Sequence, residues 1–91
     1  MTNILIGYDL NKTGKDYASL IKAIKALGSD WWHCLDSTWI IKTDLDTVAA
    51  RDSLAKHIDG NDELLVVDIT AGSAAWTGFD SDCSSWLKNN L

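Results

Sequence analysis

Residues 3–9 read Asn-Ile-Leu-Ile-Gly-Tyr-Asp, and residues 16–28 read Asp-Tyr-Ala-Ser-Leu-Ile-Lys-Ala-Ile-Lys-Ala-Leu-Gly. The first stretch is a compact apolar run, which predicts a β-strand that ends at Asp9. The second has apolar residues at helical spacing with Lys22 and Lys25 outside that face, which predicts an α-helix. Gly28 is placed to end this helix in the left-handed conformation.

A β-hairpin is predicted next. Residues 31–35 and 38–43 are aromatic and β-branched runs, and the polar pair Asp36-Ser37 separates them. Two such runs around a tight polar pair are typical of two antiparallel strands joined by a turn.

A second helix and a fourth strand complete the pattern. Thr43 or Asp44 can cap a helix that runs to about Ile58. The side chains expected to point inward from it are Leu45, Val48, Ala55 and Ile58. Residues 63–69 predict the fourth strand, and residues 70–91 predict a loop followed by a short terminal helix or extension.

The predicted order is strand, helix, strand, strand, helix, strand, followed by the tail 70–91. This is the split β-α-β pattern of α+β ferredoxin-like folds, here as a single domain over residues 1–91. Right-handed crossovers would place the first and third strands at the centre of the sheet and both helices on one face.

The strands are apolar on both faces, which points to a partner. Residues 4–6, 40–41 and 64–67 are runs of consecutive apolar residues. In a sheet with one solvent-exposed face, apolar and polar residues should instead alternate along each strand. Two helices cover only one face, so the other must meet the tail, a partner or a second copy. We predict a homodimer packed through its sheets, with Gly7 allowing the two sheets to approach closely.

The net charge of the chain is −5. Non-specific nucleic-acid affinity comes from neutralising phosphates with lysine and arginine, so this acidic balance disfavours it. The chain has one arginine, Arg51, but Lys12, Lys15, Lys22 and Lys25 gather in the first third. The sequence is therefore compatible with a local basic edge on an otherwise acidic surface.

Cys34 and Cys83 are the only cysteines. Two cysteines without a signal segment do not predict a disulfide framework, so we expect free thiols and a reducing cytoplasm. No apolar run approaches membrane-spanning length, so no membrane partner is expected.

Asp9 is the candidate metal ligand. It shares a strand face with Leu5 and Gly7, so a dimer through that face would set two Asp9 carboxylates opposite each other. Such a pair can hold Mg²⁺, with water and substrate phosphate completing the octahedron. The alternative is that Asp9 simply ends its strand and accepts hydrogen bonds in a turn.

The remaining candidates favour structure over chemistry. His33 and Cys34 are adjacent in a strand and point to opposite faces, so they are poorly placed to hold one zinc ion. Trp31 and Trp32 must also split across the two faces, one in the core and the other at an interface or as a stacking platform. The tryptophans expected in the core are Trp39, Trp76 and Trp86, the last two as anchors of the tail.

The apolar strand ending Tyr8-Asp9, and the hairpin with residues 37–40, resemble the Cas-two family of small CRISPR-associated proteins. The runs 14–17, 31–33, 35–39 and 74–76 together look like the SinR-like branch of that superfamily, to which VapD-like ribonucleases are related. The second resemblance spans nearly the whole chain.

The resemblance implies a ferredoxin-like homodimer in which Asp9 binds Mg²⁺ for endonucleolytic cleavage of RNA or DNA. Asp9 carries the catalytic role, and Ser37 transfers more weakly; Lys12 and Lys15 would steady phosphate. The family usually has an arginine-rich stretch after Tyr-Asp, which this chain lacks.

Two hypotheses about function therefore stand beside each other. One is a metal-dependent nuclease. The other is a non-catalytic dimeric scaffold or binding module, whose partner would be nucleic acid or a protein of an adaptation complex or a toxin–antitoxin-like pair. A small-molecule sensor has no support in the sequence.

Overall fold

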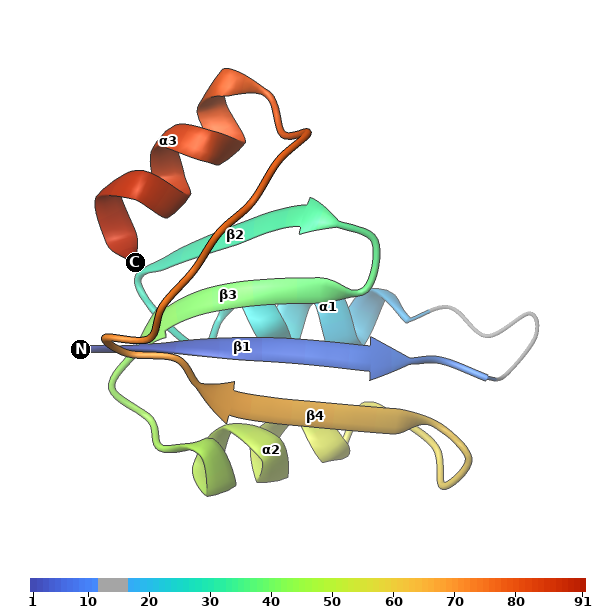
Figure 1. Ribbon diagram of the computed structural model, residues 1–91. Helices are drawn as coiled ribbons and strands as arrows, with labels where there is room; N and C mark the ends of the chain where they lie inside the picture. The colour runs from blue at the N-terminus through green and yellow to red at the C-terminus, as the bar shows by residue number, and fades with distance from the viewer. Residues whose placement is uncertain (12–16) are drawn as a thin grey trace.

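The computed structural model describes residues 1–11 and 17–91. It is an α+β structure with one four-stranded sheet and three helices (Figure 1). The elements in chain order are β1 (Thr2–Asp9), α1 (Ala18–Lys25), β2 (Asp30–Leu35), β3 (Thr38–Thr43), α2 (Thr47–Ala55), β4 (Glu63–Asp68) and α3 (Ser81–Asn90).

The sheet has the strand order β2-β3-β1-β4, and each neighbouring pair is antiparallel. The prediction that the first and third strands lie at the centre is therefore confirmed. β1 pairs with β3 from Thr2 to Gly7 and with β4 from Ile4 to Asp9. β4 and β2 form the two edges.

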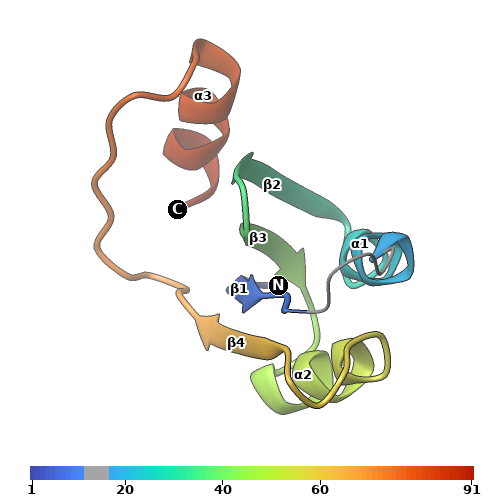
Figure 2. The ribbon, with the colours of Figure 1, turned by 90° about the vertical axis from the view of Figure 1, so that its right-hand side faces the viewer.

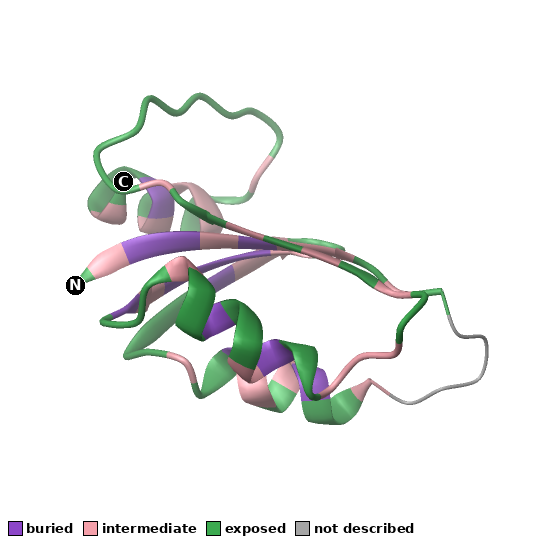
Figure 3. Cartoon of the chain, turned by 90° about the horizontal axis from the view of Figure 1, so that it is seen from below, coloured by how far each residue is buried: buried purple, intermediate pink, exposed green. Residues whose placement is uncertain are grey.

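α1 and α2 lie on one face of the sheet, as predicted, and α3 lies on the other (Figure 2). The main core fills the space between the sheet and the first two helices. Its buried members are Ile4, Ile6, Leu20, Ile24, Trp39, Ile41, Ala50 and Leu54. Figure 3 shows that the buried parts of α1 and α2 are on the sides that meet the sheet.

α1 has the face that its apolar spacing predicts, because Leu20 and Ile24 are buried and Tyr17 packs against the same core. The expectation of a left-handed Gly28 is wrong, since Gly78 is the only glycine with a positive φ among the described residues. Gly28 is needed for another reason. A Cβ there would lie 1.7 Å from the carbonyl oxygen of Lys42 in β3, so only glycine fits.

α2 begins later than predicted and turns a different face inward. Its cap is Asp46, whose carboxylate accepts the Ala49 N–H at 2.7 Å, and not Thr43 or Asp44. Thr43 is instead buried, with its hydroxyl donating to the Leu27 carbonyl at 2.7 Å.

The inward face predicted for α2 is wrong for three of its four residues. Leu45, Val48 and Ala55 are exposed, and Ile58 packs against the core from beyond the helix. The buried residues of α2 are Ala50 and Leu54. Within Thr47–Ala55 the large apolar residues are Val48 and Leu54, which lie on different faces of the helix, so apolar spacing alone does not decide which of them turns inward.

The tail ends in a helix, which was one of the two predicted alternatives; the other was an extended segment. Asp80 caps α3 by accepting the Cys83 N–H at 2.8 Å. Leu87 buries itself against Trp32 and Ile40 on the face of the sheet opposite the main core, forming a second, smaller cluster.

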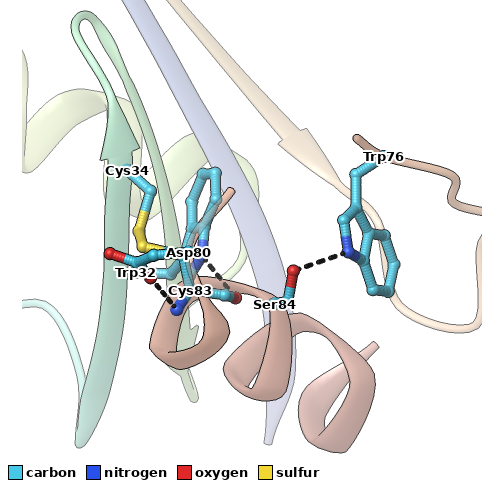
Figure 4. The surroundings of a disulfide bond; sticks show 6 residues. All are labelled: Trp32, Cys34, Trp76, Asp80, Cys83 and Ser84. Carbon is cyan, nitrogen blue, oxygen red and sulfur yellow. Dashed lines mark hydrogen bonds between the residues drawn. A yellow bond between two sulfur atoms is a disulfide. The ribbon is translucent and has the colours of Figure 1, made fainter. Parts of the chain in front are cut away.

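The tail also overturns the expectation of two free thiols, because Cys34 of β2 and Cys83 of α3 form a disulfide (Figure 4). The spacing of 49 residues along the chain gives no sign of this contact. Without free thiols, the cysteines give no argument for a reducing cytoplasm.

The three helices have 8, 9 and 10 residues. A helix that crosses a bilayer needs about 20 apolar residues. In the described ranges, none of the helices is long and apolar enough to do so.

Candidate functional site: the open face of the sheet

We call the side of the sheet away from α1 and α2 the open face. α3 covers its β2–β3 half, where Trp32 and Ile40 are only 4% and 5% exposed. The β1–β4 half has no described helix over it (Figure 2). There Leu65 is 60% exposed and Val67 is 38% exposed, and they pair with Gly7 and Leu5 of β1.

Gly7 lies at the centre of this uncovered half. The register pairs it with Thr38 on one side and with Leu65 on the other. A Cβ built on Gly7 meets nothing closer than the Leu5 side chain at 4.0 Å. Glycine is therefore not required at this position by any contact within the described chain.

A groove of about 550 Å³ lies between the open face and the arch of residues 70–80 that leads to α3. Its residues are Leu5, Trp32, Leu35, Thr38, Ile40, Asp68, Ile69, residues 72–77, Phe79, Leu87 and Leu91. Asp68 is the only acidic or basic side chain among them. Hydrogen bonds from the Thr70 backbone N–H and hydroxyl lower the pKa of Asp68 below its usual range.

Asp9 lies at the end of β1, directly opposite Glu63 of β4. Both residues are exposed. Like charges placed directly opposite on neighbouring strands repel each other, and solvent weakens this repulsion because both side chains are exposed. A divalent cation such as Mg²⁺ binds through oxygen ligands, and Asp9 and Glu63 offer two carboxylates in each chain.

Ser37 lies at the same end of the sheet as Asp9. Its carbonyl accepts the N–H of Tyr8 at 3.1 Å, which ties the hairpin turn to the residue before Asp9. Lys12 and Lys15, the predicted phosphate contacts, lie outside the described residues. Among the residues that are described, no group of three or more His, Cys, Asp or Glu side chains is positioned to hold a metal.

Aromatic contacts on the helix side of the sheet fix the strand end that carries Asp9. The Trp39 indole N–H donates to the Tyr8 hydroxyl at 3.1 Å. The His33 ring stacks on Trp39 with 3.7 Å between centroids, and its Nε2 lies 3.1 Å from the Asp36 carbonyl oxygen. His33 thus packs as a structural residue.

Strand parity separates Trp31 from Trp32 as predicted. Of the three tryptophans expected in the core, Trp39 is buried, Trp86 is partly buried and Trp76 is exposed. Trp31 lies on the helix side beside Trp39, and Trp32 lies on the open face. Trp86 is a tail anchor, as expected, because its indole N–H donates to Asp30 of β2 at 2.9 Å. Trp76 is not in the core: it is 38% exposed and donates to Ser84 of α3 at 3.3 Å.

Asp62 is an anchor that the sequence reasoning missed. Its carboxylate accepts the backbone N–H of Asn11 at 2.8 Å and the hydroxyl of Tyr17 at 2.9 Å. These two residues flank the segment that contains Lys12 and Lys15. The turn before β4 therefore holds both ends of that segment, and no local pattern signals a contact between residues so far apart in sequence.

Comparison of the chain with protein families, with curated proteins and with solved structures found no match. Inferences about function therefore rest on the geometry of the open face and on the residues that line it.

Proposed function

We propose that the chain is a non-catalytic homodimeric binding module with a ferredoxin-like fold, which dimerises through the β1–β4 half of the open face. The observation that carries this proposal is the exposure of Leu65 and Val67 around a bare Gly7. Exposed apolar residues that adjoin each other on one face are typical of interaction surfaces.

A second copy is the partner that these residues favour. The chain is acidic overall, but Leu5, Gly7, Leu65 and Val67 carry no charge, and the carboxylates of that half lie at its two ends, Asp9 and Glu63 at one and Asp68 at the other. Two equally acidic copies can therefore meet there with little repulsion. A missing side chain at the centre allows close approach of two flat sheets, which normally pack about 10 Å apart.

The test is the oligomeric state of a Leu65→Asp variant, measured by sedimentation equilibrium. In a two-fold interface each substitution occurs twice, so the dissociation constant should rise at least about 100-fold. Gly7→Arg should have a similar effect, because the monomer has room for a side chain at this position.

The matched control is Val48→Asp. Val48 is 54% exposed, comparable to Leu65, and lies on α2, which packs on the opposite face of the sheet. It borders the same hollow at the outer edge of β4 as Leu65 but does not belong to the open face. This variant should dimerise like the parent chain. A parent chain that stays monomeric at several hundred micromolar, or a Leu65→Asp variant that still dimerises normally, would contradict the proposal.

The second candidate is a magnesium-dependent endonuclease of the Cas-two-like kind, as the resemblance implies. The observation in its favour is the Asp9–Glu63 pair beside Ser37. In a dimer through the open face, both pairs would contribute carboxylate oxygens as metal ligands. The acidic charge and the lone Arg51 weaken this candidate, because polynucleotide phosphates need basic contacts.

Under this second candidate, Asp9→Asn should reduce magnesium-dependent cleavage of a labelled RNA or DNA strand at least about 100-fold, because a neutral amide is a much poorer ligand for Mg²⁺. Asp44→Asn is the control, since that side chain is 80% exposed and lies at the other end of β3. Cleavage that persists at the parent rate in Asp9→Asn would identify a contaminating nuclease.

A further inference from the structure

We infer that the Cys34–Cys83 disulfide is a redox-controlled latch: reduction by a dithiol releases α3 and uncovers the β2–β3 half of the open face. The release itself depends only on the contacts of α3. Its consequence for dimerisation rests on the proposed function.

α3 can leave without opening the main core. The cluster beneath it has three buried residues, Trp32, Ile40 and Leu87, and only Leu87 belongs to α3. None of the three is a member of the main core, which lies on the other side of the sheet. An isolated ten-residue helix is marginal in water, so α3 depends on its docking contacts.

Besides Leu87, the partly buried Cys83 and Trp86 of α3 pack against this cluster, and Ser84 accepts a hydrogen bond from Trp76 of the arch. Three further hydrogen bonds join α3 to the sheet. The Trp32 indole N–H donates to the Cys83 carbonyl at 3.1 Å, and Trp86 donates to Asp30. The Asn3 amide donates to the Asn90 carbonyl at 2.6 Å. Water can replace each of these bonds when the helix leaves, so their net contribution is modest.

Docking also leaves one polar atom unsatisfied. Asn3 is 8% exposed, and its side-chain oxygen has no hydrogen-bond partner in the described part of the chain. A buried acceptor without a partner costs free energy that is recovered when water reaches it. Release of α3 breaks the Asn3–Asn90 hydrogen bond, and access of water to the Asn3 amide offsets part of that loss.

The disulfide is open to exchange. Cys34 and Cys83 are both only partly buried, at the rim between β2 and the first turn of α3 (Figure 4). A thiolate of the dithiol attacks one sulfur, forming a mixed disulfide and expelling the other cysteine as a thiolate. The second thiol of the donor then displaces the remaining cysteine, so the donor is oxidised by two electrons and both cysteines end as thiols.

Release of α3, together with Phe79 that stacks edge-on against Trp32 just before the helix, would expose Trp32 and Ile40. These residues lie on the same face as Leu5 and Gly7 and extend the exposed apolar surface from β4 across to β2. The oxidised chain offers half of the sheet face to a second copy, and the reduced chain offers all of it. We therefore expect reduction to tighten the dimer.

Hydrogen exchange followed by mass spectrometry tests the latch on the full chain, with and without dithiothreitol. Amides of residues 83–90 should lose protection at least about 10-fold on reduction, while those of α1 keep theirs. The double variant Cys34→Ser/Cys83→Ser should match the reduced chain and stay insensitive to dithiothreitol. Unchanged protection of α3 after reduction, or equal loss throughout the chain, would overturn the latch.

Sedimentation of the same samples separates this inference from the proposed function. Loss of α3 protection in a chain that is monomeric in both redox states supports the latch and contradicts the proposed dimer. Retained α3 protection in a chain whose dimer is broken by Leu65→Asp contradicts the latch and supports the dimer.

Discussion

Replacing Gly28 with alanine should lower the free energy of unfolding by about 3 kcal/mol or more. The new Cβ would lie 1.7 Å from the Lys42 carbonyl oxygen, and backbone atoms at such a distance must move apart. That movement would pull the start of β2 away from β3, because the Ser29 N–H donates to the same carbonyl at 3.0 Å. Urea denaturation followed by circular dichroism measures the loss.

Gly60→Ala is the matched control for this prediction. No atom lies within 4 Å of a Cβ built on Gly60, and its φ is not in the left-handed region. Alanine there should change stability by less than about 1 kcal/mol, with stabilisation the expected sign, because it restricts the unfolded chain. Equal effects of the two substitutions would refute the close approach of Gly28 to β3.

Trp39→Ala should cost about 3–5 kcal/mol, the range for removing a large aromatic side chain from a core. Trp39 is 1% exposed, stacks against His33 and donates to the Tyr8 hydroxyl. For a domain of this size, such a loss lowers the melting temperature by more than about 12 °C.

Trp76→Ala provides the comparison with the same residue type. Trp76 is 38% exposed and touches α3 through one hydrogen bond, so its removal should cost less than about 1 kcal/mol. Differential scanning calorimetry of both variants checks the contrast. A melting temperature of Trp39→Ala close to that of the parent chain would show that the tryptophan lies outside the cooperative core.

Element order and strand arrangement could be predicted because they follow from local periodicity and the handedness of crossovers. The α1 face is an example: Leu20 and Ile24 recur at helical spacing and are buried. The face of α2 could not be predicted so simply. Val48 and Leu54 are its only large apolar residues, they lie on different faces, and the contact with the sheet decides that Leu54 is the buried one.

The position of the candidate site on β1 could be predicted from the sequence, but the contacts that its residues make could not. Strand parity puts Gly7 and Asp9 on the same face, and the structure places both on β1 as expected. The Asp9–Glu63 pairing depends on the register of strands more than fifty residues apart, which no local pattern encodes. The same holds for Asp62 and for the disulfide, each of which joins segments that only the folded topology brings together.

The separation of the two clusters across the sheet makes docking of α3 independent of the main core. Every member of the main core precedes Ile69, and all four strands are complete at Asp68. The sheet and its first two helices therefore contain all that their own core needs, and the disulfide fastens α3 to a sheet whose packing does not depend on it.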